Sequence, residues 1–392
     1  MPHFGLSAFL SVATSCGLLT HQLTACDATT PSVPDAISAL RQAAIVYDEA
    51  AMKTAVAHLV RSGRSALPQV HQLVHHDDAN VRWKAIETLG AIGVADPRLC
   101  PDLLTCSRDA DADVRGAAID VLAQLFPQNA LTQKAVTRLR RDPHPLVRVR
   151  AAAAQWTTRQ DLRAVEALAA ALPDADWMAA REASFRLASI GSPATPVLLT
   201  LLEKTTPQVQ RAALLTLAKF PQLPPTALHK IRPLSISDDP LLFPAAMKAL
   251  LACGNAGQRA LETCCLAVKV PQRVAALTTL ATSATAAPVV RRLVLQSLSD
   301  PADACQLAAL AVIARHRIAS PELLQPCVKR LLHPSADHRA AAIAALAVMG
   351  SPAQAALPLL RQLADREPVD YIRRAARRLA QRLDTRATPP QD

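Results

Sequence analysis

Two histidines and the groups near them are the residues in this sequence whose types and spacing suit metal chemistry. His71 and His75 stand four positions apart, with His76 and Asp78 just behind them. On a helix, this spacing places two imidazole rings on one face, where they can ligate a transition metal. The sequence shows no third or fourth ligand at a matching distance. We therefore interpret the pair as the polar end of a helix and predict no metal site.

Sequence motifs for other kinds of catalysis are absent. The chain contains no glycine-rich phosphate loop, no His-Glu-x-x-His helix, no Gly-x-Ser-x-Gly turn and no paired Cys-x-x-Cys. Each motif supplies groups that a common class of enzyme needs, such as phosphate binders, zinc ligands or a nucleophile. We therefore predict that the protein is not an enzyme, and we expect neither a cofactor nor a small-molecule substrate.

The amino-acid composition indicates that the chain is built from short helices. Hydrophobic residues make up 51% of the 392 residues but aromatic residues only 3%, so Ala, Leu and Val must form the core. Such small aliphatic side chains let helices pack closely. The 30 prolines lie mostly between apolar segments, and because proline is tolerated in a first helical turn only, this spacing indicates many short helices. No run of alternating β-branched residues is present, so we expect no sheet.

A motif recurs along the chain at a regular interval. Residues 78–82 have the pattern Asp-x-x-Val-Arg, residues 111–115 repeat it, and Val-Arg returns at 147–148. Apolar residues then follow each copy at one per helical turn. Successive copies lie about 30 to 34 residues apart, which is the length of a two-helix repeat unit. We count about eleven helical pairs over residues 35–385.

This pattern resembles that of the HEAT-repeat family, in particular its lyase-like branch of short repeats. The resemblance covers nearly everything after Val33 and is strongest over residues 66–155. It implies an all-α fold, a right-handed α-solenoid of HEAT-like helical hairpins. Most members of the family serve as scaffolds, and a minority act on bilins or DNA. The resemblance therefore implies a scaffold for protein–protein interaction, with a HEAT-like lyase or DNA-glycosylase type of enzyme as the alternative.

In HEAT proteins, the turn aspartate and an arginine of the second helix form a ladder of ion pairs between neighbouring repeats. The resemblance implies this structural role for Asp78 and Arg82, and for Asp111 and Arg115. Arg148 occupies the next ladder position, where two prolines intervene between it and the preceding aspartate.

The second helix of each hairpin lines the concave surface in HEAT arrays, where partners usually dock. The apolar residues that follow residue 81 at one per turn face the core, which leaves Trp83 on the solvated side with Lys84 and Glu87. An exposed tryptophan is a suitable anchor for a protein partner. We predict that Trp83, Lys84, Glu87 and Arg150 contact the partner. The alternative is a Trp83 side chain that packs against the neighbouring repeat.

The N-terminal segment has the features of an export signal. No Lys, Arg, Asp or Glu precedes Asp27, and residues 4–19 are apolar or small. This length fits a signal-peptide core and is short for a membrane span. Residues 23–26, Leu-Thr-Ala-Cys, resemble the lipobox of bacterial lipoproteins, and the resemblance implies that Cys26 becomes the palmitate-bearing N-terminus. The alternative is an apolar helix that packs on the first repeat.

These observations predict the organisation of the chain. We expect a lipoprotein signal peptide at residues 1–25, a flexible tether at 26–34, the repeat solenoid at 35–385 and a disordered tail at 386–392. The expected location is the cell envelope, on the periplasmic side or the outer surface, with a cytoplasmic protein as the alternative. We interpret the cysteines of the solenoid as small buried hydrophobic residues, and the sequence leaves open whether any two of them form a disulfide.

The charge of the chain allows several kinds of partner. Its formal net charge is +11 and its pI is about 9.5, which favours nucleic acid, anionic lipid or an acidic protein. The basic residues concentrate at 134–163 and 361–386, whereas a nucleic-acid groove would spread its charge over every repeat. We therefore expect a lipid-anchored scaffold with a protein partner and no nucleic acid, and we keep a basic nucleic-acid-binding solenoid as an alternative.

Overall fold

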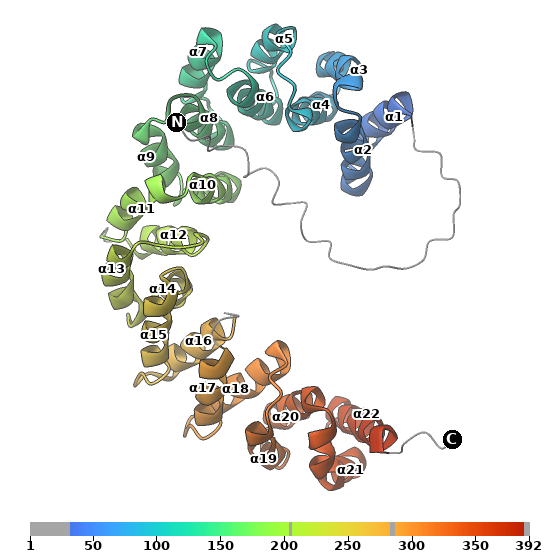
Figure 1. Ribbon diagram of the computed structural model, residues 1–392, viewed down its shortest axis with the longest axis vertical. Helices are drawn as coiled ribbons and strands as arrows, with labels where there is room; N and C mark the ends of the chain where they lie inside the picture. Colours follow the sequence, from blue (N-terminus) through green and yellow to red (C-terminus); the bar gives the residue numbers. More distant parts are fainter. Residues whose placement is uncertain (1–31, 204–205, 283–286, 388–392) are drawn as a thin grey trace. The chain divides into compact units, whose positions relative to one another are not determined.

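The structure is a computed structural model that describes residues 32–203, 206–282 and 287–387. Within these ranges the chain forms 22 α-helices, joined in places by short 3-10 turns, and no strand (Figure 1). The predicted all-α solenoid of helical hairpins is therefore confirmed.

The ends of the predicted segments differ slightly from the helices. The first helix begins at Val33, two residues before the expected start of the array, because Ser32 caps it and Asp35 completes a capping box. The last helix ends at Ala387 and so includes the first two residues of the predicted tail. Cys26, the predicted signal peptide and most of the predicted tether lie outside the described residues. Among the described residues, no helix is long and apolar enough to cross a membrane.

The chain divides into two compact units, residues 1–197 and 198–392. In unit 1, each hairpin contributes one odd-numbered and one even-numbered helix, and α4, α6, α8 and α10 pack on one another in sequence to form one layer (Figure 1). The odd-numbered helices α3, α5, α7 and α9 form the second layer. The helices of this unit are α1 (Val33–Ile45), α2 (Glu49–Ser62), α3 (Leu67–Gln72), α4 (Ala79–Ile92), α5 (Leu99–Cys106), α6 (Ala112–Leu125), α7 (Ala130–Leu139), α8 (Pro145–Arg159), α9 (Leu162–Ala170) and α10 (Trp177–Ile190).

Unit 2 repeats the same construction. Its even-numbered helices also pack in sequence, and from α14 onward each contacts the odd-numbered helix that precedes it. The boundary between the units lies within α11 (Thr195–Leu201). The helices of unit 2 are α12 (Pro207–Leu217), α13 (Pro225–Ser235), α14 (Leu242–Leu251), α15 (Gly254–Cys264), α16 (Val270–Leu280), α17 (Ala287–Ser297), α18 (Asp303–His316), α19 (Pro321–Arg330), α20 (Ala336–Met349), α21 (Leu357–Arg366) and α22 (Asp370–Ala387).

Local sequence explains where the helices start and stop. Asp78 begins α4 as its N-cap, and its carboxylate accepts hydrogen bonds from the backbone N–H groups of Asn80 and Val81 at 2.8 and 3.3 Å. Gly93 ends the same helix at φ 73°, a left-handed conformation that glycine adopts without a Cβ clash. The α6 helix begins in the same way, with Asp111 as its cap.

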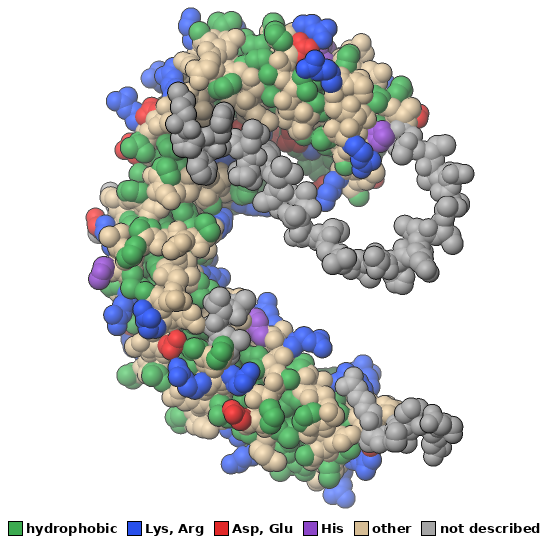
Figure 2. Space-filling view, viewed as in Figure 1, with side chains coloured by type: hydrophobic (Ala, Val, Ile, Leu, Met, Phe, Trp, Pro, Cys, Tyr) green, Lys and Arg blue, Asp and Glu red, His purple; other side chains and the backbone are tan. Residues whose placement is uncertain are grey.

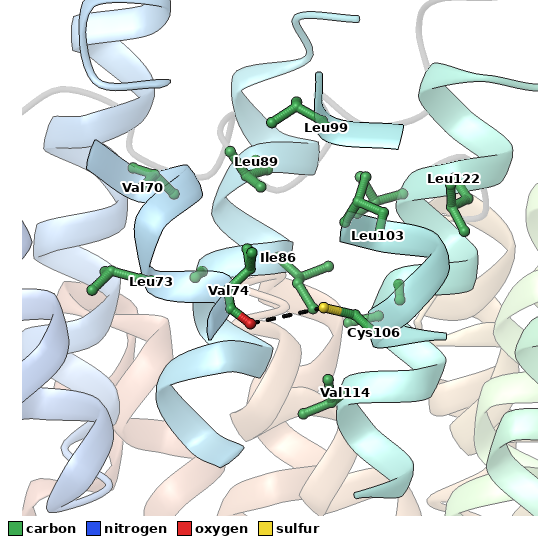
Figure 3. Close-up of a cluster of buried hydrophobic side chains, with 14 of the residues drawn as sticks. Val70, Leu73, Val74, Ile86, Leu89, Leu99, Leu103, Cys106, Val114 and Leu122 are labelled. Carbon is green, nitrogen blue, oxygen red and sulfur yellow. Dashed lines mark hydrogen bonds between the residues drawn. The ribbon is translucent and has the colours of Figure 1, made fainter. Parts of the chain in front are cut away.

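The core of unit 1 consists of aliphatic side chains from both layers. Val70, Val74, Ile86, Leu89, Leu103 and Cys106 interdigitate between α3, its 3-10 extension Leu73–His75, α4 and α5 (Figure 3). The even-numbered helices approach each other closely, because a Cβ at Gly90 of α4 would lie 2.7 Å from the Val121 Cγ2 of α6. Small residues therefore set the spacing between repeats, as the composition indicates.

Candidate partner-binding surface

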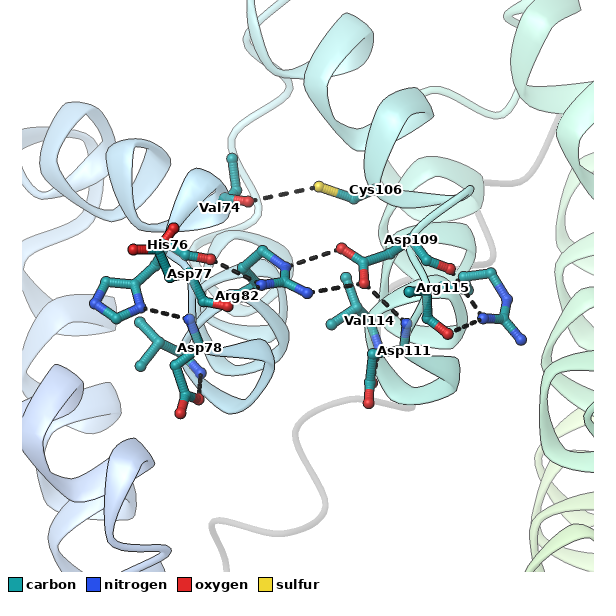
Figure 4. Close-up of polar contacts among 12 residues, drawn as sticks. Val74, His76, Asp77, Asp78, Arg82, Cys106, Asp109, Asp111, Val114 and Arg115 are labelled. Carbon is teal, nitrogen blue, oxygen red and sulfur yellow. Dashed lines mark hydrogen bonds and ion pairs between the residues drawn. The ribbon is translucent and has the colours of Figure 1, made fainter.

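Arginines at the start of the even-numbered helices link consecutive repeats (Figure 4). The Arg82 Nη1 donates to the backbone carbonyls of His76 and Asp77 at 2.8 and 2.7 Å. Its Nε and Nη2 donate to both carboxylate oxygens of Asp109, in the next repeat, at 2.8 and 2.9 Å. Each such arginine is fixed by four hydrogen bonds, and we call these contacts the ladder.

The second ladder contact has the same geometry one repeat further on. The Arg115 Nη1 donates to the carbonyls of Asp109 and Ala110, and its Nε and Nη2 donate to Asp142 at 2.9 Å. Only 13% of the Arg115 side chain and 5% of the Asp142 side chain are exposed. Burial raises the pKa of Asp142, but hydrogen bonds from Arg115 and from the His144 backbone lower it more, so the net pKa lies below its usual value.

The carboxylates of the ladder are not the ones that the sequence suggested. Asp78 and Asp111 cap α4 and α6 and make no ion pair with Arg82 or Arg115 among the described residues. The reason is geometric, because an N-cap carboxylate folds over the first N–H groups of its own helix. The acceptors are instead Asp109 in the first contact and Asp142 in the second. Each lies two positions before the N-cap of the next even-numbered helix and faces the arginine of the preceding repeat.

Arg148 makes only the carbonyl half of the ladder contact. Its Nη1 donates to the carbonyls of Asp142 and Pro143 at 3.0 and 2.8 Å. It makes no ion pair with a carboxylate of the described chain, so the ladder in unit 1 ends at α8. In unit 2, two further contacts of full geometry join Arg273 to Asp300 and Arg339 to Glu367. The sequence signal that finds them is an arginine followed 27 or 28 residues later by a carboxylate.

Trp83 lies at the start of the even-numbered layer and is half-buried. Its ring stacks on Tyr47 of the preceding hairpin, with centroids 6.4 Å apart and planes inclined by 16°. Its Nε1 donates to the Glu87 carboxylate at 3.0 Å. The Lys84 Nζ lies 3.9 Å from the Trp83 ring centroid and donates to Glu87 at 2.8 Å. Of the two predicted arrangements, the packed one therefore describes Trp83, although part of the ring remains exposed.

A second charged cluster joins the next three even-numbered helices. The Arg186 of α10 donates through Nη2 to Asp120 of α6 at 2.6 Å and through Nε to Glu182 at 2.7 Å. The Arg150 Nε of α8 lies 3.9 Å from the same Asp120 carboxylate. Burial lowers the pKa of Arg186, but the two carboxylates raise it more, so the guanidinium stays charged. The sequence indicates Arg150 but not Asp120 and Arg186, which lie 66 residues apart.

Arg150 differs from every ladder arginine. Its guanidinium makes no hydrogen bond to any described residue, and its buried Nε has no partner, although only 15% of the side chain is exposed. The side chain lies against Gly116, where an added Cβ would come within 2.8 Å of the Arg150 Cδ. Buried hydrogen-bond donors normally have acceptors, so this guanidinium keeps donor capacity that the described residues do not use.

His71 and His75 do not form an isolated pair. The Asp102 carboxylate of α5, in the next repeat, lies 2.7 Å from the His71 Nε2 and 3.4 Å from the His75 Nε2. The sequence prediction that no third ligand exists at a matching distance is therefore wrong. The reason is that Asp102 comes close only through the stacking of repeats, which the spacing along one helix does not reveal. The seven cysteines of the described residues are free thiols.

Comparison with known proteins gives a family and a set of similar folds. The family model described as HEAT repeats matches residues 33–123, 132–218 and 292–380. No curated protein matches this chain.

Among solved structures, an engineered protein is 18% identical with a TM-score of 0.36, over 81% of this chain and 98% of its own. The karyopherin Kap121p bound to Nup53p is 14% identical with a TM-score of 0.49, over 91% of this chain and 46% of that one. Kap121p bound to Pho4p is also 14% identical, with a TM-score of 0.46 over the same shares. The chain thus spans about half the length of this karyopherin, and the likeness concerns the fold alone.

Proposed function

This chain belongs to the HEAT-repeat family, and we propose that it is a scaffold that binds a protein partner through α4, α6, α8 and α10 of unit 1. The observation that carries the proposal is the Arg150 guanidinium, which is largely buried in this layer and has no hydrogen-bond partner among the described residues. A carboxylate is the group that best satisfies a guanidinium, because the two form short, charge-assisted hydrogen bonds. We infer that the partner inserts an acidic side chain here.

Exposed aromatic residues on the same layer support the proposal. Phe185 of α10 is 61% exposed although it directly precedes Arg186, and Trp177 of the same helix is 66% exposed. Aromatic and arginine side chains supply most of the binding energy at protein interfaces. In Figure 1 this layer lies on the inner side of the arc formed by the helices of unit 1, which is the side that the family resemblance assigns to partners.

The stacking of repeats also favours binding without large rearrangement. Trp83, Lys84 and Glu87 hold one another through a hydrogen bond, an ion pair and a cation–π contact. Arg186 is held between Asp120 and Glu182. Side chains that are already ordered lose little conformational entropy when a partner binds.

A crosslinking experiment tests which layer binds. A photoreactive amino acid is placed at Phe185, and the matched control carries it at Leu162 of α9, which is 57% exposed on the odd-numbered layer of the same unit. We expect a specific crosslinked protein from position 185 and none from position 162. Equal crosslinking at both positions would contradict the proposal.

The affinity of the identified partner then tests the role of Arg150. We expect Arg150→Ala to weaken binding by at least about 30-fold, the equivalent of 2 kcal/mol that defines a hot-spot residue. Arg159→Ala, on the exposed end of the same helix, is the control and should leave the dissociation constant within about twofold. An unchanged dissociation constant for Arg150→Ala would show that another surface binds the partner.

We further propose that the scaffold is anchored in the cell envelope through a lipid on Cys26. The support is the Leu-Thr-Ala-Cys sequence at 23–26 after an uncharged apolar segment. Mass spectrometry of the N-terminus, on protein from its native membrane, should find an acylated Cys26. Cys26→Ser should move the protein out of the detergent phase, and an unchanged membrane fraction would contradict this proposal without affecting the scaffold one.

A further inference from the structure

We propose that His71, His75 and Asp102 form a binding site for one divalent transition-metal ion of the zinc class. The three side chains come from consecutive repeats. His71 lies in α3, His75 ends the 3-10 turn Leu73–His75 that extends it, and Asp102 lies in the first turn of α5. Their donor atoms all lie within 4.8 Å of one another.

The distances are close to those of a zinc site. In a tetrahedral site, bonds of about 2.0–2.2 Å place neighbouring donor atoms roughly 3.3–3.6 Å apart. The His75 Nε2 and the Asp102 Oδ2 already have this separation, at 3.4 Å. The His71 Nε2 lies nearer, at 2.7 Å, because it shares a hydrogen bond with the carboxylate. The Asp102 side chain is half-buried and keeps 33% of its surface in solvent, so a small rotation can lengthen this contact.

The protonation chemistry of the two rings allows them to be ligands. A neutral imidazole binds a metal through the nitrogen that lacks a proton. A histidine that binds through Nε2 must therefore carry its proton on Nδ1. No hydrogen bond to a described residue involves Nδ1 of His71 or His75, and both rings direct Nε2 toward Asp102. Either ring can therefore hold its proton on Nδ1 and offer the Nε2 lone pair to a metal.

Two other histidines cannot bind a metal through Nε2, because their Nδ1 atoms accept hydrogen bonds. The His76 Nδ1 accepts the backbone N–H of Asp78 at 3.0 Å. The His333 Nδ1 accepts the N–H of Ser335 at 3.2 Å, which forces the proton onto its Nε2. The group of Asp303, His333 and His338 also brings donor atoms together, but the locked His333 ring cannot ligate through the nitrogen that faces Asp303. Among the described residues, the cluster of His71, His75 and Asp102 is therefore the one that combines close donor atoms with histidines free to carry their proton on Nδ1.

The donor set and the access route indicate the class of metal. Two imidazole nitrogens and one carboxylate suit Zn²⁺, Co²⁺ or Ni²⁺, whereas Mg²⁺ and Ca²⁺ prefer oxygen ligands. His75 lines an open pocket of about 730 Å³ between the odd-numbered helices, so an ion can enter from solvent. The nearby Cys106 does not compete, because burial raises the pKa of its thiol to about 11. Three protein ligands leave the fourth tetrahedral position open.

The bound ion would join the odd-numbered helices of neighbouring repeats. Arg82 and Asp109 already tie the same two repeats together at the turns that follow these helices. A metal that bridges α3 and α5 adds a second link, so binding favours the folded array and raises its melting temperature.

Calorimetric titration of the purified full chain with zinc chloride, after chelator treatment, tests the site. We expect one ion per chain at this site. His71→Gln, His75→Gln and Asp102→Asn should each weaken binding by more than about tenfold, since even outer-shell changes at metal sites cost 10- to 100-fold. The controls His76→Gln and His333→Gln should bind as the unmodified chain does.

Thermal melts and circular dichroism of the same proteins separate lost binding from lost folding. Zinc should raise the melting temperature of the unmodified chain and of both controls by a few degrees, and should not raise that of the three ligand variants. All variants should keep the helical spectrum. The proposal is overturned if the unmodified chain shows no saturable zinc binding, or if binding survives in His71→Gln and His75→Gln.

Discussion

Replacing Arg115 by alanine is the sharpest test of what holds neighbouring repeats together. Arg115 makes four hydrogen bonds, two to the carbonyls of Asp109 and Ala110 and two to the carboxylate of Asp142. The variant leaves the Asp142 side chain, of which 5% is exposed, with one hydrogen bond from the His144 N–H. Removing one partner of a buried ion pair costs about 3–5 kcal/mol, because the other charge stays desolvated. We expect a loss of stability in this range.

Arg148→Ala is a matched control for this variant. Arg148 makes the same two hydrogen bonds to turn carbonyls, with Asp142 and Pro143, but has no ion pair with a described carboxylate. Both variants lose the same kind of carbonyl contacts, and only Arg115→Ala also removes the bonds to a carboxylate. A hydrogen bond to a charged group contributes about 1.5–3 kcal/mol, so we expect Arg148→Ala to cost about 2 kcal/mol less than Arg115→Ala. The difference between the two variants isolates the contribution of the carboxylate.

The assay must resolve individual repeats, because repeat arrays can unfold in parts. Hydrogen exchange of the backbone amides in α6 and α8, together with urea denaturation, measures the local and the total free energy of unfolding. Equal losses for Arg115→Ala and Arg148→Ala would refute the ion-pair reasoning. So would an unchanged exchange rate in α6 and α8.

Three further predictions follow from packing, burial and charge. Gly90→Ala places a Cβ 2.7 Å from the Val121 Cγ2. The overpacking costs about 1–3 kcal/mol and exceeds the helix-propensity gain of about 1 kcal/mol, so the urea midpoint should fall. A rise in the midpoint would contradict the close packing of α4 on α6. Burial raises the pKa of the Cys327 thiol to about 12, so iodoacetamide at pH 8 should modify it only in unfolded protein, as peptide mass spectrometry can show. Binding of nucleic acid is measured by fluorescence anisotropy at 50 and 200 mM salt. We expect dissociation constants no tighter than about 10⁻⁶ M at physiological salt. Nanomolar binding that weakens steeply as salt increases would favour the nucleic-acid alternative.

Acid should weaken the ladder, and the direction follows from the pKa of its carboxylates. The pKa of Asp142 lies below its ordinary value of 3.8 in the folded chain, because the hydrogen bonds from Arg115 outweigh the effect of burial. A carboxyl group with a lowered pKa stabilises the folded state above its ordinary pKa, and this contribution is lost as the pH falls through the lowered value. The stability difference between the unmodified chain and Asp142→Asn should therefore begin to shrink as the pH falls below about 4, and a difference that stays constant with falling pH would contradict this assignment.

The fold was predictable because its signals are local and repeated. The Asp-x-x-Val-Arg pattern marks both the cap and the first turn of α4 and α6, and the apolar residues after it fall on one helical face. Such features need only the geometry of a single helix. The family resemblance identified Arg82 and Arg115 as ladder residues but not their acceptors, since Asp109 and Asp111 are both turn aspartates and only the packed repeats distinguish them.

The contacts of the candidate site depend on stacking between repeats. Asp120 and Arg186 lie 66 residues apart, and His71 and Asp102 lie 31 apart. Their meeting depends on the rotation of each hairpin relative to the next, which side-chain packing sets and which no sequence spacing encodes. Trp83 illustrates the same limit, because its helical position indicated a solvated face while the stacking on Tyr47 comes from the preceding hairpin.

The ladder also gives a physical reason why the partner-binding surface is proposed in unit 1. In a solenoid each repeat contacts only its neighbours, so the rigidity of a surface depends on every interface that it crosses. The contacts of Arg82 and Arg115 follow each other without a gap, and they fix α4, α6 and α8, the helices that carry Trp83, Asp120 and Arg150.

The described part of unit 2 lacks this continuity. Its two full ladder contacts begin at α16 and α20, and the helix between them, α18, has Gln306 at the arginine position. Gln306 is neutral, donates to a single carbonyl of the preceding turn and accepts from Arg330. The bidentate contact between a guanidinium and a carboxylate, which adds both energy and geometric specificity, is therefore missing at Gln306. A surface that binds through several helices at once requires fixed spacing between them. In the described part of the chain, the repeats of α4 to α8 combine that spacing with an arginine, Arg150, whose buried Nε has no hydrogen-bond acceptor.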